Sequence, residues 1–151
     1  MKLIRRTARR ALLVAALLAG ITARSDLAAA DGALAVGQTS NVAAEGFAYG
    51  FALDQPTSEA ASAEALRDCK TETPGVDPRA QALCAVVQTF KNRCFAVAMD
   101  PQDATPGVGW AIEDDEDTAG RQALTKCAAT AGEDRRGFCE VSHSGCDGSA
   151  R

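Results

Sequence analysis

Bulky and small side chains alternate along two segments of the chain, residues 47–53 and residues 108–112. The bulky positions are Phe47, Tyr49, Phe51 and Leu53 in the first segment and Val108, Trp110 and Ile112 in the second. A period of two is that of a β-strand whose two faces differ. Gly50 and Gly109 hold matching places among the small residues, where glycine marks close packing, a local bulge or a residue of a hairpin turn.

The period changes to about 3.6 after each of these strands, which predicts a helix. One apolar stripe is formed by Ala61, Ala65, Leu66 and Cys69, and the matching stripe by Ala119, Ala123, Leu124 and Cys127. Thr57 and Asp115 each stand twelve residues before the cysteine of their segment and are suitable N-caps. Both helices are therefore expected to present a narrow alanine face that ends in a thiol.

The rest of the chain extends this duplication. Turn-rich connections, residues 73–78 and 132–137, lead to further strands that begin at Cys84 and Cys139. Residues 33–37 match residues 94–98, so each unit reads strand, strand, helix, strand. The sequence predicts one α+β domain with antiparallel sheet and two helices, built from repeats of about 33–93 and 94–146 that are related by a pseudo-twofold.

Six cysteines in a chain of this size favour three disulfides, because their number is even and the first 30 residues, described below, indicate export to a compartment that oxidises thiols. Zinc is the competing interpretation, but the spacings contain no Cys-x-x-Cys pair and the chain has one histidine. Of fifteen possible connectivities, only a few respect the duplication. The favoured pairs are Cys69 with Cys84, Cys127 with Cys139, and Cys94 with Cys146, the last joining the repeats across the pseudo-dyad.

The first 30 residues are typical of an export signal, with basic residues before an apolar run from Ala11 to Ala23 and small residues before Asp31. About 13 apolar residues are fewer than the roughly 20 that a spanning helix needs, so no stable membrane anchor is expected. The arginine pair near the start loosely resembles a twin-arginine signal, and the general secretory route is the favoured alternative. A single mature domain of residues 31–151, secreted or periplasmic, is therefore predicted.

The charge of that domain limits its partners. Residues 31–151 contain ten basic and nineteen acidic residues, which gives a net charge of −9 with histidine neutral. An acidic surface repels phosphate backbones and anionic lipid, so neither nucleic acid nor an anionic membrane surface is an expected partner.

Several of these segments together resemble a known family. They are Gly50 to Leu53, the helix ending Ala65-Leu66-Arg67-Asp68-Cys69, the run from Cys84 to Cys94, Phe95 to Ala98, Gly109 to Ile112, and Ala123-Leu124-Thr125-Lys126-Cys127. The combination, over about residues 33–146, is similar to the bacterial exported family of domain of unknown function 4189. The resemblance implies an exported bacterial domain and supplies no established catalytic residues.

Three features carry candidate chemistry. The run Glu113–Asp117 offers carboxylates to calcium, yet it lacks the alternating ligands and glycine of a calcium loop and instead suits a helix start, where acids oppose the dipole. His143 lies between two serines and could activate a hydroxyl, although no orienting acid or oxyanion site is located. Tyr49, Phe51 and Trp110 are either core residues or an exposed aromatic interface for a glycan or peptide.

The sequence thus predicts a small exported binding module without enzymatic activity. It would act on an extracytoplasmic protein or an envelope component, as an inhibitor, adaptor or secreted effector. The alternatives are a small secreted hydrolase that uses His143 or the acidic run, and an envelope or stress protein without a dedicated ligand. No cofactor and no metal are indicated.

Overall fold

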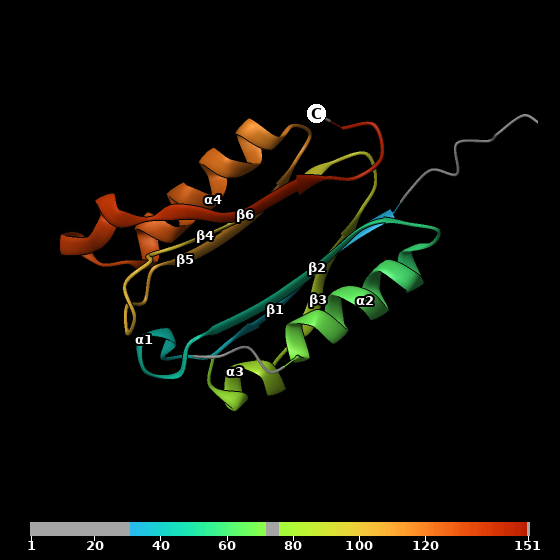
Figure 1. The fold of residues 1–151 in the computed structure, drawn as a ribbon. Helices are drawn as coiled ribbons and strands as arrows, with labels where there is room; N and C mark the ends of the chain where they lie inside the picture. The colour runs from blue at the N-terminus through green and yellow to red at the C-terminus, as the bar shows by residue number, and fades with distance from the viewer. Residues whose placement is uncertain (1–30, 72–75, 151) are drawn as a thin grey trace, which may run out of the picture.

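The structure, a computed structural model, describes residues 31–71 and 76–150 (Figure 1). The strands are β1 (Asp31–Gln38), β2 (Phe47–Gln55), β3 (Ala85–Phe90), β4 (Cys94–Met99), β5 (Val108–Glu113) and β6 (Glu140–Cys146). The helices are α1 (Val42–Glu45), α2 (Ser58–Lys70), α3 (Pro78–Ala82), α4 (Glu116–Thr130) and the 3₁₀ helix η1 (Glu133–Phe138). The predicted export signal and the turn at residues 73–75 lie outside the described residues.

The strands form two antiparallel three-stranded sheets, one for each repeat. Their orders are β2-β1-β3 and β5-β4-β6, so the first strand of each repeat is central. The predicted α+β class and the strand, strand, helix, strand order are confirmed, and the structure adds that the sheet is divided in two. Figure 1 shows the resulting layers: α4, its sheet, the other sheet, and α2.

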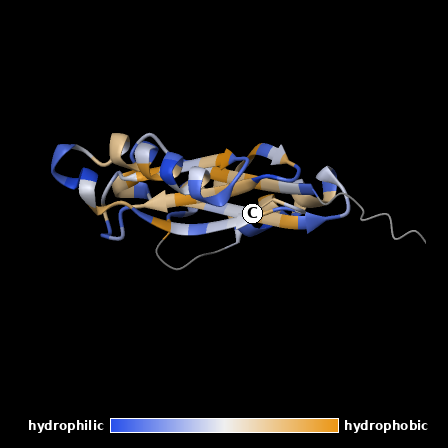
Figure 2. Ribbon diagram, turned by 90° about the horizontal axis from the view of Figure 1, so that it is seen from above, coloured by the Kyte–Doolittle hydropathy of each residue, from blue (hydrophilic) through white to orange (hydrophobic). Residues whose placement is uncertain are grey.

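The two faces of each strand explain this layering. Small residues of each sheet pack under its helix, in one cluster with Ala33, Ala35, Ala61 and Ala65 and another with Ala96, Ala98, Ala119 and Ala123. Bulky residues fill the space between the sheets, including Leu34, Val36, Phe47, Phe90, Phe95, Val97, Val108 and Ile112. Figure 2 shows the hydrophobic residues concentrated on the strands and hydrophilic residues along the helices. Burial of bulky side chains between the sheets therefore joins the two repeats.

Gly50 and Gly109 mark close packing. A Cβ atom on Gly50 would overlap the carbonyl oxygen of Ala65 and the nitrogen of Cys69, which belong to α2. A Cβ on Gly109 would overlap the same two atoms at the equivalent residues of α4, Ala123 and Cys127. Helix and sheet backbones touch directly at these two points, which only the absence of a side chain permits.

The strand registers correct one part of the repeat alignment. Ala35 is opposite Gly50 in the first sheet, and Ala98 is opposite Gly109 in the second. Residues 33–37 therefore correspond to residues 96–100, two positions beyond the predicted match to 94–98. Gln88 of β3 and His143 of β6 also correspond, since they are opposite Leu34 and Val97, which are themselves equivalent.

The cysteines pair as expected: Cys69 with Cys84, Cys127 with Cys139, and Cys94 with Cys146. The first two join a helix end to the strand that follows it. The prediction that the third joins the two repeats across the pseudo-dyad is wrong, because Cys94 and Cys146 are directly opposite each other on neighbouring strands of the second sheet. Each sheet is thus tied to its own helix, and the second sheet also carries a bond between strands.

Helix starts follow the prediction. The Thr57 hydroxyl accepts a hydrogen bond from the Ala60 N–H, and the Asp115 carboxylate accepts one from the Thr118 N–H. Glu116 and Asp117 lie in the first turn of α4, near the positive end of its dipole. The connections before β3 and β6, predicted as turns, contain the short helices α3 and η1. In the first of them, Asp77 and Pro78 favour a helix start, as the N-cap and first residue of α3.

Candidate functional site

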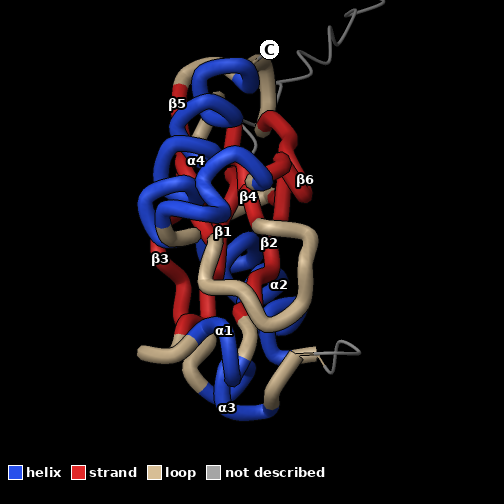
Figure 3. The backbone as a smooth tube through the Cα atoms, turned by 90° about the vertical axis from the view of Figure 1, so that its left-hand side faces the viewer, coloured by secondary structure: helices blue, strands red, loops and turns tan. Residues whose placement is uncertain are grey.

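One end of the molecule brings together equivalent connections of the two repeats. β1 and β4 both run toward this end, where residues 39–46 lead from β1 to β2 and residues 100–107 lead from β4 to β5. Figure 3 views the molecule from this side, with α1 and α3 below and the α4 side above. We call this region the open end. The disulfides Cys69–Cys84 and Cys127–Cys139 also lie toward it, because both large helices finish here.

The open end contains a pocket of about 740 Å³. This volume falls within the range of roughly 300–1,000 Å³ that is common for ligand sites. Its walls are α1 with Gly46, the start of β2, residues 76–77, and the segment that leaves β4 and enters β5; the lining includes Val42, Glu45, Phe47, Tyr49, Val76, Asp77, Met99, Asp100, Asp103, Thr105 and Val108. Both repeats therefore contribute to the pocket.

The apolar part of the lining continues the core between the sheets. Phe47 and Val108 belong to that core, and Tyr49, Met99 and Val42 pack against it. Apart from Val42 of α1, these side chains lie on the bulky faces of their strands, so the alternation that builds the core also gives the pocket an apolar floor. The pocket is the place where the space between the two sheets reaches the surface.

Carboxylates line the pocket on the side of the first repeat. Glu45 accepts a hydrogen bond of 2.5 Å from Nη1 of Arg79, and the Asp77 carboxylate accepts bonds from the backbone N–H and the guanidinium of the same arginine. The backbone hydrogen bond first, and the Arg79 guanidinium second, hold the pKa of Asp77 below its ordinary value. Arg79 thus faces two carboxylates and neutralises one unit of their charge.

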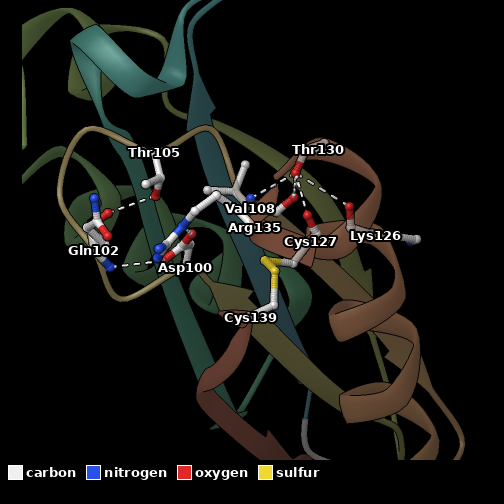
Figure 4. The surroundings of a disulfide bond; sticks show 9 residues. All are labelled: Asp100, Gln102, Thr105, Val108, Lys126, Cys127, Thr130, Arg135 and Cys139. Carbon is white, nitrogen blue, oxygen red and sulfur yellow. Dashed lines mark hydrogen bonds and ion pairs between the residues drawn. A yellow bond between two sulfur atoms is a disulfide. The ribbon is translucent and has the colours of Figure 1, made fainter. Parts of the chain in front are cut away.

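On the side of the second repeat, Asp100 and Arg135 form a bidentate pair (Figure 4). Nε of Arg135 is 2.7 Å from one carboxylate oxygen and Nη2 is 2.5 Å from the other. The side chain of Asp100 is fully buried, and it also accepts a hydrogen bond from the Gln102 N–H at 3.0 Å. The side-chain bonds from Arg135 are the main cause that lowers the pKa of Asp100. This pair fixes the start of the β4–β5 connection.

Asp103 differs from the other carboxylates of the lining. It is exposed, and no described residue forms a hydrogen bond or an ion pair with its carboxylate. The next residue, Ala104, has a φ of 59°, in the left-handed region that non-glycine residues seldom adopt. The β4–β5 connection therefore presents a negative charge at the edge of the pocket that no described residue neutralises.

The predicted aromatic interface is divided by the structure. Tyr49 lines the pocket, whereas Phe51 and Trp110 do not contribute to it. All three are partly buried and pack against the core between the sheets, and the ring of Phe51 lies 4.5 Å from that of Phe95. The Trp110 ring faces Nζ of Lys126 at 5.1 Å, within the range of a cation–π contact.

His143 is an exposed residue of β6, opposite Val97 and so on the face that is directed at the other sheet, and it does not line the pocket. Its Nδ1 is 2.5 Å from the hydroxyl of Tyr49, so the pair connects the two sheets. Ser142 also lies within hydrogen-bond distance of the Tyr49 hydroxyl, and Ser144 donates to Glu116. His143 is thus bonded to a phenol. Its neighbour Ser144 is bonded to the Glu116 carboxylate and not to His143.

The other end of the molecule is held by a residue that the sequence did not single out. Asp147 follows β6 and is fully buried, and its carboxylate accepts hydrogen bonds from the N–H groups of Asp54 at 2.9 Å and Asn92 at 3.2 Å. Its own N–H donates to the Arg93 carbonyl at 2.9 Å. The side-chain oxygens of Asp54 and Asn92 accept hydrogen bonds from the N–H groups of Gly148 and Ser149. We call residues 53–55, 91–93 and 146–149 the closed end.

Two general features of the described residues complete this description. Among residues 31–71 and 76–150, no three histidine, cysteine or acidic side chains are grouped so that they could hold a metal ion. Within the same residues, no helix has the length and apolar character needed to cross a membrane. The acidic run at 113–117 is accounted for by the start of α4 and by the pairing of Asp114 with Arg93.

Residues 32–146 match the model of the family described as Domain of unknown function (DUF4189). The chain belongs to this family. The family description names no activity, so it assigns no role to the pocket. No curated protein and no solved structure matches the chain. The match covers both repeats, all three disulfides and both connections of the open end, which makes the pocket a feature of the matched region.

Proposed function

We propose that this family member is an exported binding module without enzymatic activity, and that the pocket at the open end contacts an extracytoplasmic protein or envelope component. The observation that carries the proposal is the pocket itself, which has an apolar floor, a polar rim and walls from both repeats. Clefts of this kind are the usual form of a ligand site. The disulfides, one of which lies toward the open end in each repeat, support a role outside the cytoplasm, where such bonds persist.

A hydrolase that uses His143 is the weaker alternative. A catalytic triad needs a nucleophile, a base and an orienting acid in one hydrogen-bonded series. Here the bonded hydroxyl is that of Tyr49, and Ser144 is bonded to Glu116 instead of His143. An envelope or stress protein without a dedicated ligand is the other alternative, and the same experiment separates it from a binding module.

Site-specific photocrosslinking tests the proposal. A benzophenone amino acid replaces Ala44, an exposed residue of α1 in the pocket lining, and in a control protein it replaces Thr89, which is exposed on β3. We expect the Ala44 protein to form one saturable crosslinked product in its native compartment, removed by an excess of unlabelled protein. Equal crosslinking from Thr89, or no product from Ala44, would contradict a binding site at the open end.

A further inference from the structure

Resting on the proposed function, we infer that the occupant of the open-end pocket is a segment of a partner protein that carries a lysine or arginine beside an apolar side chain. The inference combines two independent properties of the pocket: its apolar floor and the sign of its charge. The apolar floor disfavours ligands without an apolar group, and the negative charge disfavours anionic ligands. A segment that is both apolar and cationic satisfies both conditions.

The floor selects an apolar group. Phe47, Met99 and Val108 are contributed by three different strands, and the floor is continuous with the core between the sheets. An apolar side chain that enters the pocket would extend this core and remove its own surface from water, which is favourable at about 25 cal/mol per Å² of apolar area. A fully hydrated ion or a sugar without an apolar face would gain nothing from this surface.

The rim selects a positive charge. Among the residues that the structure describes, the lining contains the carboxylates of Glu45, Asp77, Asp100 and Asp103 and no basic side chain. Arg79 and Arg135 approach from outside the lining and pair with three of these acids, which leaves a net charge of −2 around the pocket. Residues 31–151 as a whole, these groups included, carry a net charge of −9. Anionic groups would be repelled by this field, and cationic groups would be drawn toward it.

Asp103 is the residue that we expect to make the direct contact. Asp100 already has Arg135, and Glu45 and Asp77 share Arg79, so a ligand cation would have to compete with those arginines. Asp103 is exposed and pairs with no described residue, so it can bind a lysine or arginine without losing an existing bond. An exposed ion pair contributes roughly 0.2–1 kcal/mol in general, which corresponds to at most about a fivefold change in affinity.

Three acetylated and amidated tetrapeptides of sequence Leu-X-Leu-X, with X as lysine, glutamine or glutamate, test the inference by NMR titration of the purified oxidised protein. We expect the lysine peptide alone to shift the signals of Tyr49 and Met99, with an affinity that falls as salt rises. Asp103→Asn should weaken binding about three- to fivefold. Asp134→Asn, which removes an exposed carboxylate of η1 outside the pocket, should leave the affinity unchanged.

The other outcomes overturn the inference in distinguishable ways. Equal binding of the glutamine or glutamate peptide would refute the charge preference while leaving a binding pocket in place. Equal binding of free lysine amide would refute the apolar part. Equal affinities of the Asp103→Asn and Asp134→Asn proteins would refute the role of Asp103. If no peptide shifted the pocket signals, this class of occupant would be wrong, and crosslinking from Ala44 would decide the proposed function separately.

Discussion

The open end and the closed end use carboxylates in opposite ways. At the closed end, Asp147 is fully buried and accepts backbone hydrogen bonds from Asp54 and Asn92, so the charge joins segments of both repeats. At the open end, each carboxylate with a side-chain partner pairs with an arginine of its own repeat, Glu45 and Asp77 with Arg79, and Asp100 with Arg135. The first arrangement closes the sandwich. The second holds each wall separately and leaves space between the two walls.

Within the open end, the two repeats also differ from each other at equivalent residues. The strand registers make Gly37 of β1 equivalent to Asp100, which follows β4. Ala80 of α3 and Arg135 of η1 are equivalent by spacing, since each stands four residues before the cysteine that ends its connection. A Cβ atom on Gly37 would overlap the Ala80 carbonyl, so the first repeat supports this connection by direct backbone packing. The second repeat uses an ion pair at the same place. The same position can therefore support a pocket wall by close packing or by charge.

The disulfides give the largest expected difference between the ends. Replacing both Cys94 and Cys146 with alanine removes the closed-end disulfide, whose cysteines are 52 positions apart in the sequence. The chain-entropy model then gives a loss of about 4 kcal/mol in the free energy of unfolding. Removing Cys69–Cys84 or Cys127–Cys139, with separations of 15 and 12, should each reduce stability by about 3 kcal/mol. Urea unfolding of the three double variants measures these values. A smaller loss of stability for the closed-end disulfide than for the other two would contradict the expected difference between the ends.

Truncating the buried carboxylate of the closed end should have the next largest effect. Asp147→Ala leaves two backbone N–H groups without their acceptor, and losing two charge-assisted bonds reduces stability by about 3 kcal/mol. The matched open-end variant, Asp103→Asn, removes a charge that pairs with no described residue and should leave the unfolding midpoint unchanged. Comparable losses in both variants would show that the two ends do not differ in the way described.

The helices connect the ends, since α2 and α4 each run from the closed end to a disulfide at the open end. Gly50→Ala and Gly109→Ala should push the helix away from its sheet in either repeat, with similar losses of about 2 kcal/mol. Gly120→Ala is the control, because its Cβ would meet Val141 at an ordinary 3.7 Å, and alanine favours the helix by about 0.5–1 kcal/mol. Thermal unfolding compares the three. Unequal losses at Gly50 and Gly109 would argue against equivalent repeats.

The smallest expected effect is a change in pH dependence at the open end. The pKa of Asp100 is lowered in the folded protein, mainly by Arg135, so the stabilisation is complete above the unfolded value near 4. It is lost as the pH falls through the lower folded value. Asp100→Asn keeps an oxygen that accepts from Arg135 but does not titrate. Its urea midpoint should therefore fall less than that of the unaltered protein when the pH is lowered from about 5 to about 2, the range over which a carboxylate with a lowered pKa loses its stabilising effect. An unchanged acid slope would remove Asp100 from this role.

The sequence alone predicts the fold well because its signals are local. The alternation in residues 47–53, the caps Thr57 and Asp115, and the cysteine after each helix each specify one element or one bond. The repeat alignment failed by two residues for a physical reason. A strand pattern of period two is unchanged by a shift of two, so Ala33 fits Cys94 and Ala96 equally well until the sheet register is known.

The pocket and the closed end could not be predicted in this way. The pocket is formed by two connections about 60 positions apart in the chain, residues 39–46 and 100–107, and neither has a periodic pattern. The sequence predicts Tyr49 as a possible interface residue, but its place at the pocket depends on how the two sheets pack. Asp147 is a single acid after a strand, and its role requires the positions of Asp54 and Asn92. Such sites depend on tertiary packing, which local sequence does not encode.

Hydrogen–deuterium exchange of the protein with and without its crosslinked partner tests most directly whether the open end is the ligand-binding end. Partner binding should protect the backbone amides of residues 40–47 and 99–108, which border the pocket, and leave those around Asp54, Asn92 and Asp147 unchanged. Protection confined to the closed end, or spread evenly over both ends, would contradict a binding site in the pocket.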